Sequence, residues 1–280
     1  MKKTITILLS LLLLLSFVGC KKEDNKDDKV IKVGATLVPH AEILNNIVKE
    51  KLAKEGWTLE VVEFNDYVTP NTALEEGSLN ANYFQTLGYM NNQNEQGGLH
   101  LVAVLGVHIE PMGIYSKKFS SLDAIPDGAS ISVPNDTDNY QRALELLVAK
   151  GLLKGTGSKE ELDASAEKNP RGFKITPLDA AYLPRSLDDV DLAVINGNYA
   201  LEAGLPQSSP ALTIEEFDQE TSIRRTNFIV VKAGSENDPK VQALINAINS
   251  QEVADYINNT YKGAVIPSFI DANGKPVSKK

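Results

Sequence analysis

The chain alternates short apolar runs with amphipathic segments from residue 30 onward. Apolar, β-branched runs such as 31–35 and 101–109 are typical of buried strands. Segments such as 39–54, in which apolar residues recur every three or four positions, are typical of helices that bury one side. We expect strands at 31–35, 57–61, 79–82, 101–109, 112–115, 131–133, 173–175, 192–195 and 228–231. We expect helices at 39–54, 70–77, 137–150, 179–185, 197–202, 239–248 and 253–261.

This order of elements predicts an α/β protein in which mainly parallel sheets are flanked by helices. The succession runs through two rounds, and the chain is expected to return to its first sheet near Asn227. We therefore expect two lobes, the first formed by residues 30–113 and 226–280 and the second by residues 114–225. Because ligands of open α/β sheets bind beyond the carboxyl ends of the strands, a ligand cleft should lie between the lobes.

The first twenty residues have the layout of a secretory signal. Lys2 and Lys3 precede an apolar stretch at 5–18, which is too short for a typical membrane-spanning helix. Small residues then lead into Cys20, as in the lipobox of bacterial lipoproteins, although Phe17 stands where leucine is usual. The pattern indicates an exported lipoprotein.

Cys20 is the only cysteine in the sequence, so a disulfide framework is excluded and the thiol is free for acylation. We expect residues 1–19 to be a signal peptide and Cys20 to carry a lipid such as palmitate. The alternative is an ordinary signal peptide with an incidental cysteine. Residues 20–29 contain no apolar side chain after the cysteine and predict a disordered tether. The predicted location is the cell envelope, with the lipid holding the protein to a membrane on its periplasmic or extracellular side.

The balance of charge and the missing motifs narrow the possible functions. A formal net charge of −9 argues against binding to nucleic acid or to anionic lipid surfaces. The sequence contains no nucleophile elbow, phosphate-binding loop, dinucleotide fingerprint or zinc-binding helix motif. The three histidines, His40, His100 and His108, are too scattered to indicate a metal cluster. We therefore expect a binding protein rather than an enzyme, with no cofactor and no metal.

Polar loops follow two of the predicted strands and open the helices behind them. Arg142 lies one turn into the helix after residues 135–139, where helix N–H groups and a guanidinium could bind a carboxylate. The alternative for Arg142 is a surface ion pair on a capped helix. Asn198 follows the strand at 192–195 through Gly197, and its amide could bind both charged groups of an amino acid. The alternative there is a plain turn between strand and helix.

Aromatic and polar residues near other strand ends extend this candidate site. Tyr83 and Phe84 follow the expected strand at 79–82 and could line a pocket for an apolar side chain, although such aromatics are often core residues. His108 could face the cleft or complete a hinge, and Asn227 lies where the chain is expected to cross between lobes. Together these residues favour the zwitterion of a small amino acid with an apolar side chain as ligand.

The sequence also resembles the NlpA/MetQ family of substrate-binding lipoproteins, which serve ABC importers for methionine. The resemblance covers nearly the whole chain after the tether, in order. The matching stretches are 39–44, 66–71, 80–85, 108–116, 133–136, 139–144, 189–200 and 263–267.

This resemblance implies a two-lobed periplasmic-binding-protein fold of type II that closes on its ligand. It implies that Arg142 binds the ligand carboxylate and that Asn198 and Asn227 hold the amino-acid backbone. The residues that it assigns to the pocket around the ligand side chain are Tyr83, Phe84 and His108. It further implies methionine as ligand, L-methionine in the first place, with an ABC permease and its ATPase as partners of a monomeric receptor.

One residue departs from the family pattern. The family usually has a histidine after the motif at 83–85, whereas this chain has Thr86. Threonine is shorter than histidine and cannot become cationic, so the pocket could be larger or differently polar on that side. Another apolar amino acid or a short methionine-containing peptide is therefore the alternative ligand. A dehydratase-like enzyme and an adhesin on the same fold are the rival functions.

Overall fold

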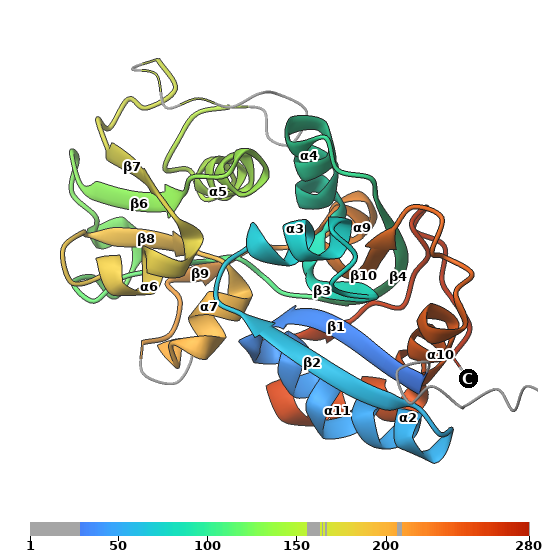
Figure 1. Ribbon diagram of the computed structural model, residues 1–280. Helices are drawn as coiled ribbons and strands as arrows, with labels where there is room; N and C mark the ends of the chain where they lie inside the picture. The colour runs from blue at the N-terminus through green and yellow to red at the C-terminus, as the bar shows by residue number, and fades with distance from the viewer. Residues whose placement is uncertain (1–28, 156–162, 164, 166, 206–208, 280) are drawn as a thin grey trace, which may run out of the picture.

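The computed structural model describes residues 29–155, 163, 165, 167–205 and 209–279. Two sheets, each covered by helices, lie side by side in the molecule (Figure 1). The predicted signal peptide at 1–19, the lipidation site Cys20 and residues 20–28 of the tether lie outside the described residues. Within the described ranges, no helix is both long enough and apolar enough to span a membrane.

The first sheet has six strands in the order β11-β4-β10-β3-β1-β2. β1 runs parallel to β2 and β3, whereas β10 is antiparallel to both β3 and β4, and β11 is antiparallel to β4. Most strands therefore point the same way, in agreement with the mainly parallel sheet expected from the sequence. The strands are β1 (Val30–Thr36), β2 (Thr58–Phe64), β3 (Ala81–Thr86), β4 (Leu101–Ile109), β10 (Thr226–Lys232) and β11 (Ile266–Pro267).

Helices cover both faces of the first sheet. Strand β10 shows why: Ile229 and Val231 pack into the cluster that contains α10 and α11, while Phe228 and Val230 pack into the one that contains α3 and α4. All four side chains are fully buried. A strand in which apolar residues do not alternate with polar ones must be covered on both faces. One face carries η2 (Leu37–Ala41) and η3 (Leu44–Val48), which are π-helical turns, with α2 (Lys49–Lys54), α10 (Pro239–Ile248) and α11 (Gln251–Tyr261), and the other carries α3 (Thr69–Glu75) and α4 (Leu87–Gly97).

The second sheet has five strands in the order β7-β6-β8-β5-β9. β6 is parallel to β7 and β8, and β5 is antiparallel to β8 and β9. Along β8, Leu192 and Val194 pack toward α5, whereas Ala193 and Ile195 pack toward α6 and α7. The elements are β5 (Gly113–Tyr115), η4 (Leu122–Ala124), β6 (Ser130–Pro134), α5 (Thr137–Ala149), β7 (Lys174–Leu178), η5 (Ala180–Tyr182), α6 (Leu183–Ser186), β8 (Leu192–Ile195), α7 (Gly197–Glu202) and β9 (Thr213–Ile214).

The chain passes between the two sheets twice. Residues 110–112 lead from β4 into β5, and α9 (Gln219–Arg225) leads directly into β10. In each sheet the strand that receives the crossing, β5 or β10, runs antiparallel to both of its neighbours. Gly113 already belongs to the second sheet, and Thr226 to the first. These crossings bring Glu110 and Asn227 to the boundary between the sheets.

Two sequence expectations differ from the structure near this boundary. The strand expected at 79–82 is wrong in its bounds, because β3 runs from Ala81 to Thr86 and therefore contains Tyr83 and Phe84. Helix α4 was not expected, since its sequence is rich in asparagine and glutamine and has no clear apolar stripe. Thr86 begins this helix by accepting a hydrogen bond from the Tyr89 backbone N–H with its hydroxyl.

Candidate ligand-binding site

A cavity lies where the two sheets meet, between the end of β3 and the starts of α5 and α7. It encloses about 360 Å³ of space not filled by protein atoms, its open side included. Five of the predicted site residues line it: Phe84, Thr86, Arg142, Asn198 and Asn227. The other lining residues are Tyr67, Gln85, Tyr89, Glu110, Asn139, Asn196 and Gly197.

Arg142 is a buried cation on the first turns of α5. Its Nε donates to both carboxylate oxygens of Glu215 at 3.1 Å, and its Nη2 donates to Glu215 Oε2 at 2.6 Å and to the Glu110 carbonyl at 2.8 Å. Burial raises the pKa of Glu215, but the guanidinium charges of Arg142 and Arg225 outweigh it and hold that pKa below its usual range. The pair is therefore ionised and internal, rather than the surface ion pair that was the alternative for Arg142.

Two asparagines that line the cavity each present one unpaired polar atom. The Oδ1 of Asn198 accepts from the Tyr67 hydroxyl at 2.5 Å, and the Nδ2 of Asn196 donates to Asn139 Oδ1 at 2.8 Å. Within the described part of the chain, Asn198 Nδ2 and Asn196 Oδ1 are buried and have no hydrogen-bond partner. A buried polar atom without a partner costs about 1–3 kcal/mol. A ligand that offers an acceptor and a donor would remove that cost.

Aromatic rings form the apolar part of the cavity wall. Tyr67, Phe84 and Tyr89 line it, with ring centroids 5.7–6.0 Å apart, and Tyr199 packs behind Tyr67 at 5.0 Å. The Tyr89 hydroxyl donates to the Tyr67 carbonyl at 2.9 Å, which fixes the two rings relative to each other. A wall of this kind suits an apolar or thioether side chain.

Contacts across the boundary join the two halves of the cavity. Besides the bond from Tyr67 to Asn198, the Tyr199 hydroxyl donates to the Asn65 carbonyl at 3.2 Å. Thr86 Oγ1 donates to Asp138 Oδ2 at 3.4 Å. The two lobes are thus already in contact around the cavity.

Tyr83 and His108 lie behind the cavity wall instead of lining it. Neighbouring side chains of a strand point to opposite faces, so Phe84 faces the cavity while Tyr83 points into the core of the first sheet. The Tyr83 hydroxyl is hydrogen-bonded to His108 Nδ1, and His108 Nε2 lies 2.6 Å from Glu110 Oε1. Both residues therefore reach the cavity only through Glu110.

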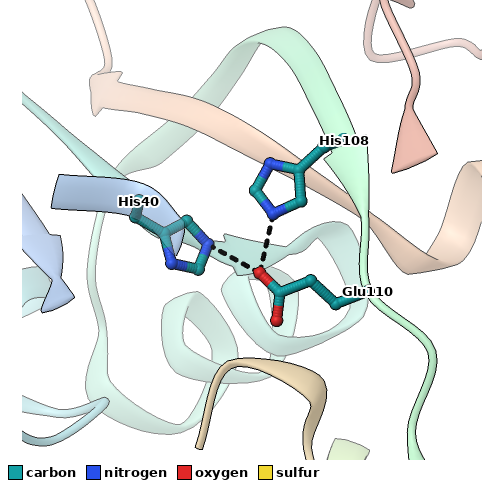
Figure 2. A group of neighbouring side chains, drawn as sticks. All are labelled: His40, His108 and Glu110. Atoms are coloured by element: carbon teal, nitrogen blue, oxygen red, sulfur yellow. Dashed lines mark hydrogen bonds and ion pairs between the residues drawn. The ribbon is translucent and has the colours of Figure 1, made fainter. Parts of the chain in front are cut away.

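His40, from η2, completes this buried group, and Figure 2 shows both imidazoles directed at the Glu110 carboxylate. Its Nε2 lies 3.3 Å from Glu110 Oε1 and 3.2 Å from Asn227 Oδ1. The fold thus joins two of the three histidines that appeared scattered in the sequence. Burial lowers the pKa of His40 to about 4 and that of His108 to about 3, and it raises the pKa of Glu110.

Acidification should destabilise the folded protein, because His40 and His108 stay neutral within it. An unfolded imidazole has a pKa of 6.5, so below that pH the unfolded chain binds two protons that the folded chain excludes. Stability therefore falls as the pH drops from 6.5 toward 4. The raised pKa of Glu110 acts in the opposite direction, so the loss in urea unfolding between about pH 6 and 4.5 should be smaller than the about 2.7 kcal/mol per pH unit that two excluded protons alone would give.

Two histidine variants test the origin of this slope. His108→Gln removes one of the excluded protons and should make the slope shallower by about 1.4 kcal/mol per pH unit in that interval. The matched control is His100→Gln, because the His100 side chain is 72% exposed, and this variant should keep the wild-type slope. Equal slopes in wild type and His108→Gln would contradict the assignment.

The sequence analysis missed several lining residues, among them Tyr67, Glu110 and Asn196. All three lay within stretches that carried the family resemblance, and Glu110 also directly follows the strand that ends at Ile109. The stretch at 108–116 and the position after a strand end were the available signals for Glu110. Tyr67 lies in the loop after β2, and no local pattern indicates that it reaches the second lobe.

Comparison with known proteins places the chain in a family. The sequence model of the NlpA lipoprotein family matches residues 31–269. The chain belongs to this family. The NlpA relatives include the D-methionine-binding lipoprotein MetQ of Escherichia coli (strain K12), which is 37% identical over 262 residues, 91% of this chain and 94% of the relative.

Solved structures of similar proteins have the same fold. A nutrient binding protein from Burkholderia cenocepacia, solved bound to methionine, is 42% identical, with a TM-score of 0.78 over 85% of this chain and all of that chain. The substrate binding protein of a methionine transporter from Streptococcus pneumoniae is 35% identical, with a TM-score of 0.78 over 85% of this chain and 95% of that chain. The two-lobed α/β fold expected from the sequence is thereby confirmed.

Proposed function

We propose that this NlpA-family protein is the substrate-binding lipoprotein of an ABC importer and captures methionine between its lobes. The observation that carries the proposal is a cavity in which a buried guanidinium, an unpaired amide donor and an unpaired amide acceptor lie beside an aromatic wall. The names of the relatives, which include methionine-binding proteins and the binding protein of a methionine transporter, support the same ligand. Another apolar amino acid or a short methionine-containing peptide is the alternative.

Different residues of the cavity contact different parts of the ligand. Arg142 and the Asn198 Nδ2 donor bind the carboxylate, because a charged donor and a neutral one together satisfy its oxygens. Asn196 and Asn227 hold the polar end of the ligand from either side of the boundary. The thioether lies against Tyr67, Phe84 and Tyr89, since sulfur makes favourable contacts with aromatic rings.

Binding acts by stabilising the closed arrangement of the lobes. Phe84, Thr86 and Asn227 come from strands of the first sheet, whereas Arg142 and Asn198 come from helices that pack on the second. A ligand that touches both sets binds the closed state more tightly than the open one and shifts the population toward it. The permease then recognises the closed receptor, and the ATPase supplies the energy for transport. The protein itself catalyses no reaction in this scheme.

The lipid on Cys20 and the tether at 20–29 keep the receptor near its importer. A tether of this length confines the folded part to a small volume at the membrane face and so raises its local concentration there. The receptor acts as a monomer in the cell envelope.

Calorimetry on ligand-stripped protein tests this function. The chain is unfolded in guanidinium chloride, dialysed free of ligand, refolded and titrated with L-methionine, D-methionine, leucine and glycyl-methionine. We expect one methionine per chain, with methionine bound more tightly than leucine. At a hundredfold excess over the dissociation constant, methionine should add about 2.7 kcal/mol to the free energy of unfolding. Failure of every member of this set to bind would refute the proposal, as would turnover of any of them.

A further inference from the structure

Glu110 is a buried carboxylate at the first crossing between the sheets, and none of the roles above uses its charge. Its Oε1 faces His40 and His108, while its other oxygen points away from both rings (Figure 2). The side chain lines the cavity, and the backbone N–H of Asn198 hydrogen-bonds the carboxyl group. These contacts fix the position of the Glu110 side chain, which still lines the cavity where the ligand would bind.

Two imidazoles and a carboxylate are also common metal ligands, but their spacing here is that of a hydrogen-bond network. Ligands at about 2.0–2.2 Å from a tetrahedral zinc ion lie roughly 3.4 Å apart. His108 Nε2 lies only 2.6 Å from Glu110 Oε1, which is the separation of a strong hydrogen bond. The group favours protons over a metal ion.

One arrangement of protons satisfies the network around an ionised Glu110. Thr36 Oγ1 lies 2.8 Å from His40 Nδ1, and the Tyr83 hydroxyl contacts His108 Nδ1, so both hydroxyls can donate to the rings. Each neutral ring then carries its proton on Nε2: that of His108 donates to Glu110 Oε1, while that of His40 donates to Asn227 Oδ1 and lies 3.3 Å from Glu110 Oε1. The His108 ring and the Asn198 backbone N–H are thus neutral donors that stabilise a negative charge on Glu110 without cancelling it.

Among the described residues, no lysine or arginine pairs with the Glu110 carboxylate. The nearest guanidinium, that of Arg142, donates to the Glu110 backbone carbonyl and forms its ion pair with Glu215; its charge lowers the pKa of Glu110 but does not outweigh burial, which leaves that pKa raised. A buried carboxylate with no cation in direct contact is unfavourable unless one is supplied from elsewhere. The cavity is the side from which one can arrive.

We propose that Glu110 binds the α-ammonium group of the amino-acid ligand and that the site therefore selects ligands with a free, charged amine. The inference rests on the proposed function, because it names the charged partner for one end of that ligand. The Arg142 guanidinium donates to the Glu110 backbone carbonyl and both side chains line the cavity, so a positive and a negative group lie on the same wall, as the two ends of a zwitterion require. His40 and His108 are positioning residues that act through Glu110.

A comparison of two ligands with two proteins isolates this contact. Wild type and Glu110→Gln are titrated with L-methionine and with 2-hydroxy-4-methylthiobutanoate, which carries a hydroxyl in place of the ammonium group. In the wild type, methionine should bind at least about 30-fold more tightly than the hydroxy acid, the effect of leaving a buried charge unpaired. Glu110→Gln should weaken methionine by about the same factor and leave the hydroxy acid almost unchanged.

The matched control is Glu202→Gln, a carboxylate of α7 that does not line the cavity, and it should alter neither affinity. Equal weakening of both ligands in Glu110→Gln would make Glu110 a structural residue and overturn the inference. Equal affinity of the wild type for both ligands would also overturn the inference, but it would leave the proposed function intact. Binding of neither ligand by the wild type would refute the proposed function instead.

Two further measurements do not depend on the variant. In a crystal structure of the wild-type complex, the ammonium nitrogen should lie about 3 Å from a Glu110 carboxylate oxygen. A nitrogen pointing away from Glu110 would overturn the inference. Calorimetry with zinc chloride should show no stoichiometric binding. If the protein binds zinc and binds methionine only when zinc is present, Glu110 belongs to a metal site and the inference is overturned.

Discussion

Replacing Arg142 by alanine should abolish methionine binding measurable by calorimetry and also lower the stability of the ligand-free protein. The substitution removes the guanidinium that binds the ligand carboxylate, and removing one partner of a buried charge pair typically weakens binding by about 2–5 kcal/mol. It also leaves Glu215 buried with only Arg225, whose Nε lies 3.3 Å away, as a charged neighbour. We expect a loss of about 3 kcal/mol in the free energy of unfolding, measured by urea titration.

Two other arginine variants separate the roles of shape and charge. Arg142→Lys keeps the positive charge but cannot reproduce the planar fork on Glu215, so it should recover part of the stability and little of the affinity. Arg171→Ala removes a partly exposed arginine that pairs with the exposed Asp127, donates to the Ile125 carbonyl and lies over the Phe173 ring; it should cost some stability and leave the methionine affinity unchanged. Undiminished methionine affinity in folded Arg142→Ala would show that the carboxylate is bound elsewhere.

Gly197→Ala should weaken ligand binding and destabilise the boundary between the lobes, although it adds only one methyl group. A Cβ at this position would lie 2.7 Å from Glu110 Cβ and 3.0 Å from the Pro111 carbonyl oxygen, and neither atom is the end of a flexible side chain. Relieving the overlap moves α7 away from the crossing, which displaces Asn198 from the cavity. We expect about 1–3 kcal/mol of destabilisation in thermal unfolding, together with a clear loss of affinity in calorimetry.

The matched control is Gly97→Ala near the end of α4, where the new Cβ would meet only the Leu99 side chain, at 3.3 Å. Alanine also has the higher helix propensity, so this variant should be close to neutral. If Gly197→Ala binds methionine as the wild type does, close approach of α7 to Glu110 is not needed for the site.

The sequence predicted the fold well where the local pattern and the tertiary environment agree. β8 is an apolar run with both faces covered, and α5 has a regular apolar stripe, so both were found with nearly correct bounds. Helix α4 was missed because its stability comes from a cap at Thr86 and from packing of Tyr89 and Met90, which a weak apolar pattern does not reveal.

For the site too, the residues that a local sequence pattern marks were predicted, and those that depend on distant contacts were not. Arg142 and Asn198 could be found because they follow strands at the start of helices, and the cavity does contain them. Tyr83 and Phe84 could not be told apart, because which face of β3 is buried depends on residues distant in the sequence. Glu110 was missed for a similar reason, since its partners His40 and Asn198 come from elements far apart along the chain. Their roles in binding stay predictions until the variants are measured.

The central place of β10 has a consequence for the order in which the molecule can fold. β10 lies between β3 and β4, yet more than a hundred residues of the second sheet and its helices separate β4 from β10 in the sequence. The second sheet can therefore form while β3 and β4 still lack their common neighbour, and pairing across such a separation is slow. His40 and Asn227 can meet only once β10 has inserted, so the ligand site is among the last parts of the protein to form.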